Sequence, residues 1–370
     1  MASVEKRVLP SGRPRWDVRY RLPGNRDVLT KTFKTAGEAK DFRSQVEADA
    51  ARGLHVDPRR QKITVADWCD QWLAGKTNLA ATTRERYEGI VQGHIRDQWA
   101  RTQLGGLKHA KVQAWLAGLE LAPASVRKIH RVFSQALDFA VKDGRLATNP
   151  ARGVSLPRVE DPEKQYLTHI QVQQLAEACG PSYRLLVLFL AYTGLRWGEM
   201  AALKVSRLDF RRRRVLVAES ITPVRGVLTP GPTKGHERRE VPMPRHLVAE
   251  LKKLVKGRAP SALLFPGVRG GEAMRSAVFR RGALDKAAKQ LGLEGFTPHS
   301  FRHTAASLAI AAGADVKVVQ TMLGHKSATL TLDLYGHLFP DRLDEVADAM
   351  ETARVASLDE ARKRRAQAAA

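Results

Sequence analysis

The spacing of apolar residues changes near residue 60, and no other sequence feature constrains the fold as strongly. Residues 16–22 alternate between apolar and polar with a period of two, which is typical of a half-buried strand. Residues 28–33 predict the returning strand, and residues 4–9 are a candidate third strand. Thr35 and Glu38 match a capping box, which predicts that a helix follows. The sequence therefore predicts a small sheet backed by one helix.

Between residues 62 and 150 the apolar spacing becomes three and four, which predicts amphipathic helices. Helices are expected after Thr64, after Thr83, around Trp115 and from Ser125 to Gly144. Tryptophans lie on the apolar faces, and we interpret them as core residues. Residues 62–150 are therefore predicted to form a compact helical domain.

A stretch rich in proline and glycine separates the helical section from the rest of the chain. Asn149-Pro150 ends the last helix because the residue before a proline disfavours helical geometry. Helical patterns return from Tyr166, and strand-like residues 214–218 and 239–241 flank a Gly/Pro-rich stretch. We predict a mainly α chain with small β-sheets (α+β), divided into residues 1–60, 62–152, a linker 153–164, residues 165–350 and a tail 351–370.

The charge of the chain predicts an anionic partner. Lysine and arginine number 62 against 38 aspartate and glutamate residues, which gives a formal net charge of +24. The positive excess is spread through every part of the chain, which fits a protein that lies along an extended polyanion. Nucleic acid is the leading candidate and an anionic membrane surface is the second. Basic residues that only solvate the surface are the simpler alternative.

Other features argue against several classes of protein. No window reaches the uninterrupted apolar length of a membrane-spanning helix, and the first residues lack the apolar stretch of a secretory signal. The two cysteines, Cys69 and Cys179, are too few for a disulfide framework or a cysteine-rich zinc site. The sequence therefore predicts a cytoplasmic protein that binds nucleic acid and no membrane.

Basic residues on the predicted strands and on the last helix of the helical section are the candidate contacts with DNA. A small sheet can place a basic face in a DNA groove, and a basic helix side suits phosphates. A sheet that serves only for packing is the alternative. The candidates are Arg19, Arg21 and Lys31 in the sheet, and Arg127, Lys128 and Arg131 on the helix.

Six residues after residue 190 stand out as candidates for chemistry. Singly they indicate little, because a lone arginine is usually at the surface, a lone histidine structural and a lone tyrosine in the core. His299 and His303 have the four-residue spacing of a helical metal pair, but no third ligand is evident, so zinc is not expected. The six are Arg196 after a glycine turn, Lys234 at a predicted hairpin tip, His299, Arg302, His325 beside a glycine, and Tyr335.

Together these residues suit a reaction that uses cations, imidazoles and one phenol. Mg²⁺-dependent phosphoryl chemistry would need acidic ligands, and no Asp-x-Asp or comparable group accompanies them. A tyrosine oxygen can attack a phosphodiester while guanidinium and imidazole groups neutralise the charge that develops on the phosphate.

The order and spacing of the six residues resemble the tyrosine recombinases of the phage integrase family. The segment 297–338, with its Leu-Gly-His and Tyr-Gly-His strings, carries the resemblance most closely. The resemblance covers the whole chain in outline and is most specific after Gly194. The resemblance implies an arm-type DNA-binding domain over residues 1–60, a helical core-binding domain of the SAM-like type over 62–152, and a catalytic domain over 165–350.

The resemblance also implies a role for each site residue, and it implies no cofactor, metal or ATP. Tyr335 would be the nucleophile, forming a 3′-phosphotyrosyl link and releasing a 5′-hydroxyl. Arg196 and Arg302 would clamp the non-bridging oxygens, because their planar forks bind such oxygens in pairs. The remaining roles are Lys234 as the acid that protonates the leaving 5′-oxygen, His299 as the acceptor of the tyrosine proton, His325 as a donor to a non-bridging oxygen, and Glu199 as an orienting residue.

The function implied is site-specific recombination that integrates or excises a phage or mobile element. The implied partners are double-stranded DNA attachment sites, three further copies of the chain in a homotetramer, a directionality factor and a DNA-bending host protein. The place of action would be the nucleoid of a bacterial host cell. A type IB topoisomerase-like enzyme and a DNA-binding regulator without catalysis are the alternatives.

Overall fold

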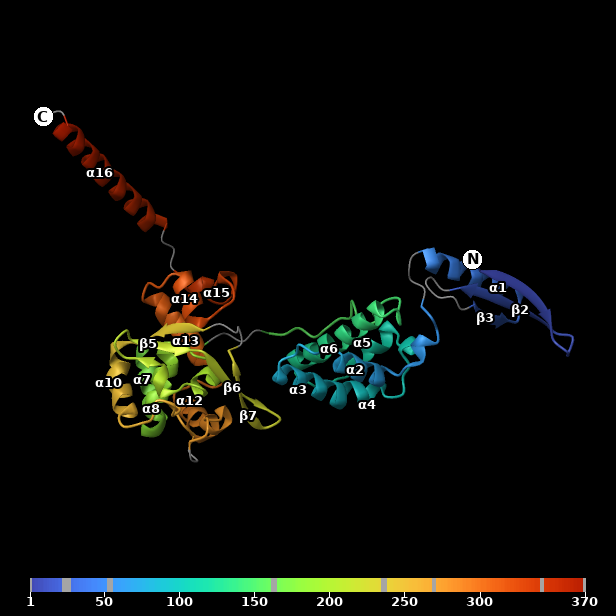
Figure 1. Cartoon of the computed structure of the whole chain (residues 1–370), viewed down its shortest axis with the longest axis horizontal. Coiled ribbons are helices and arrows are strands. Elements are labelled where there is room, and N and C mark those ends of the chain that lie inside the picture. The colour runs from blue at the N-terminus through green and yellow to red at the C-terminus, as the bar shows by residue number, and fades with distance from the viewer. Residues whose placement is uncertain are drawn as a thin grey trace. The chain divides into compact units, whose positions relative to one another are not determined.

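A computed structural model describes residues 2–21, 28–51, 56–160, 165–233, 238–267, 271–339 and 343–368. It confirms the expected fold class, a mainly helical chain with small antiparallel sheets (Figure 1). The chain divides into two compact units, residues 1–161 and 162–370, and each is described by itself. Among the described residues, no helix is both long and apolar enough to span a bilayer.

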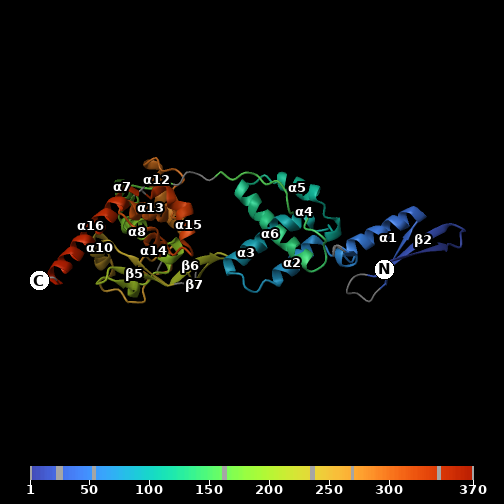
Figure 2. The ribbon, with the colours of Figure 1, turned by 90° about the horizontal axis from the view of Figure 1, so that it is seen from above.

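The N-terminal sheet has three antiparallel strands in the order β1-β2-β3, with helix α1 packed on one face (Figure 2). Val18 and Tyr20 of β2 are buried against Ala39 and Val46 of α1. The expected capping box is present, because the Thr35 hydroxyl and the Glu38 carboxylate each accept a backbone N–H of the other residue. The elements are β1 Ser3–Val8, β2 Pro14–Arg21, β3 Val28–Phe33 and α1 Ala36–Ala51.

The three basic candidates of the sheet lie on two different faces. Lys31 is paired with Val18 across the strands, and paired residues point to the same face. Its ammonium therefore lies on the helix-covered side, 4.4 Å from the ring centre of Phe42. Arg19 and Arg21 are exposed on the opposite face. Grouping Lys31 with the two arginines was wrong, since strand pairing sets the face and the sequence alone did not fix the register.

The helical section packs around a core rich in tryptophan, as expected. Trp68, Trp72, Trp99 and Trp115 are all buried in it, and the Trp68 indole donates to the Ala136 carbonyl at 2.8 Å. The helices are α2 Val65–Ala74, α3 Ala81–Ile90, a π-helical turn Val91–Ile95, α4 Arg96–Trp99, α5 His109–Ala117 and α6 Pro123–Lys142.

Two of these helices begin earlier than the sequence predicts. The helix expected after Thr83 starts at Ala81, and the one expected from Ser125 starts at Pro123. Proline suits the first helical position because it lacks the N–H that would have no partner there. The cap expected at Thr64 is present, since its hydroxyl accepts the Asp67 N–H.

The first part of the predicted linker is bound to the helical section. Gln113 donates to the Ser155 carbonyl at 3.0 Å, and Arg127 donates to the Pro157 carbonyl at 2.8 Å. Val154 and Leu156 pack against the tryptophan-rich core. The end of the predicted linker, residues 161–164, lies outside the described residues.

The second unit holds two small antiparallel sheets among its helices. Strands β4, β5 and β8 form one sheet, and β6 and β7 form a separate hairpin. The strands are β4 Leu208–Asp209, β5 Arg214–Val217, β6 Glu219–Val224, β7 Val227–Pro232 and β8 Arg239–Pro242. The helices are α7 His169–Ala178, α8 Pro181–Thr193, α9 Trp197–Ala201, α10 Arg245–Val255, α11 Ser276–Phe279, α12 Asp285–Gln290, α13 Ser300–Ala311, α14 Val316–Leu323, α15 Ala328–Tyr335 and α16 Leu343–Ala368. The single helix α16 runs across the predicted boundary at residue 350.

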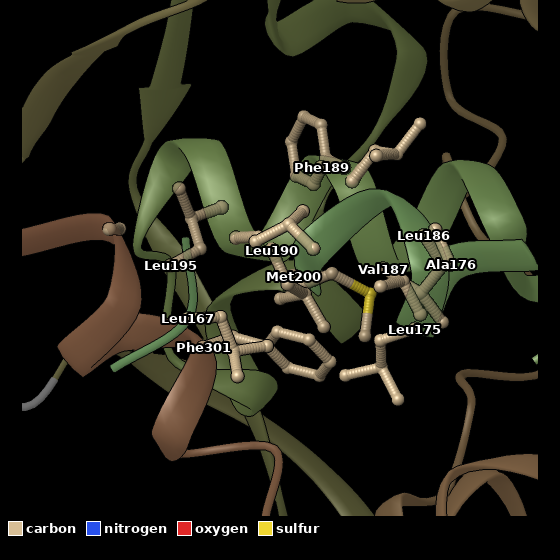
Figure 3. Packing of buried hydrophobic residues seen from close by; sticks show 14 of the residues in the cluster. Leu167, Leu175, Ala176, Leu186, Val187, Phe189, Leu190, Leu195, Met200 and Phe301 are labelled. Atoms are coloured by element: carbon tan, nitrogen blue, oxygen red, sulfur yellow. The ribbon is translucent and has the colours of Figure 1, made fainter. Parts of the chain in front are cut away.

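The core of this unit lies where α8 packs against α7 and α13. Figure 3 shows Leu190, Leu195 and Met200 beside Phe301 of α13, all of them buried. These apolar contacts join the end of α8 and the start of α9 to the start of α13. They therefore position two of the chain segments that contribute to the candidate site, the α8–α9 turn and the start of α13.

Gly198 of α9 lies against the β6–β7 hairpin, and this contact generates a prediction. A Cβ atom at Gly198 would lie 2.7 Å from the Ile221 carbonyl oxygen and 2.5 Å from the Ser220 hydroxyl oxygen. Gly198→Ala should therefore destabilise the second unit by about 1–3 kcal/mol, because the hairpin must move away. Calorimetric unfolding of the full chain measures this effect.

Gly89 provides the matched control, since it is also helical and a Cβ there meets nothing within 4 Å. Gly89→Ala should be neutral or stabilise by about 0.5–1 kcal/mol. Equal unfolding behaviour of the two variants would contradict the close packing of α9 on the hairpin.

Candidate active site

A glycine turn places Arg196 at the start of α9. Helix α8 ends at Gly194, whose positive φ of 64° suits glycine. A Cβ atom there would lie 2.9 Å from a methyl carbon of Leu323 and 3.1 Å from Cβ of Ala305. The backbone therefore approaches α13 and α14 closely at this point, and Arg196 follows as the N-cap residue of α9.

A buried carboxylate, Glu199, holds two arginines. Its oxygens accept from Arg196 Nη1 at 2.9 Å and from Arg239 Nη1 and Nη2 at 3.0 and 2.6 Å. Burial alone would raise the pKa of Glu199, but hydrogen bonds and charge from Arg239, with help from Arg196, hold that pKa below its ordinary value. The carboxylate therefore stays ionised and fixes both guanidinium groups.

Arg302 is almost completely buried, with 2% of its surface exposed. Its guanidinium donates to the Gly194 carbonyl at 2.9 Å and to the Leu323 carbonyl at 2.5 Å. Burial and then the charge of Arg196 lower the pKa of Arg302 to about 9. The group is still positive at neutral pH. The carbonyl oxygens hold the guanidinium in place but do not neutralise its positive charge. A nearby anion would therefore be strongly attracted.

His325 follows the left-handed Gly324 at the end of α14 and is 8% exposed. Its Nδ1 lies 2.9 Å from the hydroxyl oxygen of Thr331. Burial, followed by the charges of Arg302, Arg196 and Arg239, lowers the pKa of His325 to about 4. The imidazole is therefore neutral at pH 7. A Thr331 hydroxyl that donates to Nδ1 leaves the ring proton on Nε2, the tautomer that can donate to an anion.

Tyr335 ends α15 and has 1% of its surface exposed. Its ring is parallel to that of His325, with centroids 6.3 Å apart, and its hydroxyl lies 2.9 Å from Nδ1 of His303. Burial raises the pKa of Tyr335 to about 12, although the charges of Arg302 and Arg196 act in the opposite direction. The phenol is therefore protonated at neutral pH and needs a proton acceptor before it can attack.

A cavity of about 370 Å³ opens beside Arg196, Arg239 and His325; its lining is mainly basic and includes one acidic residue, Glu240. Gly324 and buried Thr233 also contribute to its wall. The volume and the charge suit a phosphate group with part of a sugar–phosphate backbone. Its basic lining consists of Arg196, Arg238, Arg239, Lys317, His325 and Lys326.

The structure brings four of the six predicted residues together: Arg196, Arg302, His325 and Tyr335. His299 is exposed just before α13, with its ring edge-on to His303 and 5.0 Å between the centroids. Lys234 lies outside the described residues.

Sequence reasoning missed Arg239, His303 and Thr331 as parts of the site. Arg239 has no distinguishing signal, because it is one of 62 basic residues and its strand is short. His303 was considered only as half of a metal pair, although its place one residue after Arg302 was a usable signal. Thr331 could be found only from its contact with His325.

The three basic candidates on α6 (Arg127, Lys128 and Arg131) are exposed, as expected of residues that contact phosphates. Arg127 is partly engaged by the Pro157 carbonyl. Within the described residues, no group of three or more His, Cys, Asp or Glu side chains could hold a metal ion.

Comparisons with known proteins show which family and which proteins this chain resembles. Residues 165–342 match the sequence model of the phage integrase family. The chain is similar to the integrase of Mycobacterium phage D29, at 27% identity over 297 residues, which cover 78% of each protein. It is also similar to a XerC-like tyrosine recombinase of Caldanaerobacter subterraneus subsp. tengcongensis, at 25% identity over 366 residues, covering 89% of this chain and 92% of that protein.

A solved structure has a similar fold, the crystal structure of a lambda integrase tetramer bound to a Holliday junction. The likeness has a TM-score of 0.59 at 20% identity and covers 88% of this chain and 96% of that chain. Residues 165–342 therefore form a phage integrase family domain, and over most of its length the chain is similar to integrases and tyrosine recombinases.

Proposed function

We propose that this protein is a site-specific DNA recombinase that cleaves and rejoins strands through a 3′-phosphotyrosyl intermediate. The observation that carries the proposal is the position of Tyr335 beside Arg302 and His325, because His325 together with Arg196 also lines a cavity rich in basic groups. Each of these groups has a chemical task in the attack of a phenol on a phosphodiester.

The two arginines and His325 act on the phosphate. Arg196 lines the cavity and is held in place by Glu199, while Arg302 supplies a buried charge that is held by two backbone carbonyls. Both groups are positioned before DNA arrives, so they stabilise the extra negative charge of the transition state without reorganising. Neutral His325 donates from Nε2 to a non-bridging oxygen.

The covalent step exchanges one phosphodiester bond for another. Tyr335 Oη loses its proton and forms a bond to phosphorus, and the bond from phosphorus to the 5′-oxygen breaks. The leaving 5′-oxygen takes a proton from Lys234, a role that rests on the sequence resemblance. The phosphotyrosyl bond keeps the energy of the broken bond, so the reverse attack by a 5′-hydroxyl rejoins the strand without ATP.

The similar proteins support a role in moving DNA elements. One is a phage integrase, and the lambda integrase structure is a tetramer on a Holliday junction. We infer that this chain acts as a homotetramer on double-stranded attachment sites, where it integrates or excises a phage or another mobile element. Residues 1–60 would bind arm sites and residues 62–152 core sites, with a directionality factor and a DNA-bending protein as accessory partners.

The first prediction concerns the nucleophile. On a nicked suicide substrate, the wild-type chain should accumulate a covalent protein–DNA adduct, and Tyr335→Phe should not, because it lacks the attacking oxygen. Denaturing gel electrophoresis measures the adduct. The reaction should proceed in excess EDTA, because cationic side chains are proposed to neutralise the phosphate.

Tyr183→Phe is the matched control, because Tyr183 belongs to the same unit and packs on Phe279 away from the cavity lining. It should form the adduct at the wild-type level. An adduct in Tyr335→Phe would show that another residue attacks.

Loss of cleavage in EDTA that Mg²⁺ restores would contradict the proposed chemistry. Relaxation of supercoiled DNA without recombination would favour the topoisomerase alternative.

The second prediction concerns the arginine clamp. Arg196→Lys and Arg302→Lys keep the charge but lose the planar fork, so cleavage should fall by about 10²-fold or more. DNA affinity should change little, because many other basic residues contribute to it. Cleavage rates under single-turnover conditions and gel-shift affinities give the two readouts.

Arg184→Lys serves as the control, since Arg184 forms an ion pair with Glu250 in the same unit and is not part of the cavity wall. It should cleave like the wild type. If both clamp variants cleave at nearly the wild-type rate, the phosphate is bound elsewhere.

A further inference from the structure

His303 is the imidazole next to the proposed nucleophile. Its Nδ1 lies 2.9 Å from Tyr335 Oη, and the two ring centroids are 5.7 Å apart. The sequence resemblance gives His299, and not His303, the task of accepting the tyrosine proton. His299 is exposed and packs its ring edge-on against His303.

Helix α13 fixes this geometry. Arg302 is anchored by the carbonyls of Gly194 and Leu323, so the next residue, His303, has a defined position on the helix. The half-buried His303 ring therefore lies between exposed His299 and buried Tyr335. A proton that leaves Tyr335 has an acceptor at hydrogen-bond distance without any rearrangement.

The other imidazole that stacks with Tyr335 is less suited to accept a proton. His325 uses Nδ1 for Thr331, and its ring lies parallel to the phenol, with an interplanar angle of 3°. Its Nε2 is needed as a donor to the phosphate. The positive charges of Arg302, Arg196 and Arg239 also disfavour a second positive charge on this ring.

We propose that His303 is a catalytic residue that accepts the proton of Tyr335 Oη during strand cleavage. The inference rests on the proposed function. The Oη–H bond breaks and the proton goes to Nδ1 of His303, in the tautomer whose own proton is on Nε2. The freed electron pair of Oη forms the bond to phosphorus, and the bond to the 5′-oxygen breaks as before. During rejoining, His303 returns the proton to Oη.

Two variants of the full-length chain separate proton transfer from simple positioning. In His303→Asn the side-chain oxygen can occupy the place of Nδ1 and accept a hydrogen bond from Tyr335, but it cannot take the proton. His303→Ala removes both abilities. If His303 accepts the proton, both variants should bind core-site DNA normally and lose about 10²-fold or more in single-turnover cleavage.

His246→Asn is the matched control. His246 belongs to the same unit and packs edge-on against Tyr192, outside the cavity lining. It should cleave at the wild-type rate. Wild-type cleavage by His303→Asn would overturn the proposal, because a residue that accepts only a hydrogen bond would then suffice.

A second measurement distinguishes loss of proton transfer from a structural defect in the His303 variants. Trifluorotyrosine at position 335 is a more acidic phenol, which needs less help from a base. The cleavage defect of His303→Asn should shrink to less than tenfold when Tyr335 is replaced by this analogue. A defect of unchanged size would indicate a structural effect and would also overturn the proposal.

These outcomes are distinct from failure of the proposed function. If the wild-type chain forms no covalent adduct, or if Tyr335→Phe still forms one, the proposed function fails and the inference fails with it. If the adduct forms through Tyr335 and His303→Asn cleaves normally, only the role of His303 is lost.

Discussion

The ion pairs of the buried Glu199 carboxylate hold the rest of the site in place. Glu199 is 1% exposed and pairs with Arg196 of the α8–α9 turn and with Arg239 of β8. Arg239 in turn donates from Nε to the Met322 carbonyl at the end of α14, so one carboxylate connects three separate segments. Removing one partner of such a group leaves an uncompensated buried charge, which is costly. A Cβ at Gly324 would lie only 2.9 Å from Arg239 Cδ, so this packing is also tight.

Burial, followed by the charges of nearby arginines, shifts the pKa values of three titratable groups in one place. Backbone carbonyls hold the guanidinium of Arg302 in place. Its pKa is lowered only to about 9, so the group remains positive at neutral pH. His325 lies near three arginines, and its pKa of about 4 keeps it neutral above that pH. Tyr335, with a pKa of about 12, keeps its proton until a base takes it. The site thus holds positive guanidinium groups, a neutral imidazole and a protonated phenol across the physiological pH range, the states that the proposed mechanism requires.

Local patterns in the sequence predicted much of the fold, and tertiary contacts explain what they missed. Helical spacing and capping residues such as Thr64 located the helices, because these signals act within one or two turns. The β6–β7 hairpin was missed because its prolines and glycine favour a loop, although a two-stranded edge tolerates them. Tyr335 and Arg302 could be named from their order in the sequence. Arg239 could not, because its importance comes from Glu199, 40 positions away in the chain. His303 had only its place next to Arg302 as a signal, since its contact with Tyr335 spans 32 positions.

In the proposed mechanism, a DNA phosphate binds beside Tyr335 and contacts Arg196, Arg302 and His325. A crystal structure of the Tyr335→Phe chain with a core-site DNA duplex tests it most directly. The two guanidinium groups and His325 Nε2 should lie within hydrogen-bond distance of the non-bridging oxygens of one phosphate. The ring at position 335 should have its edge toward the phosphorus atom. A phosphate bound outside this cavity, or one contacted by neither arginine, would contradict it.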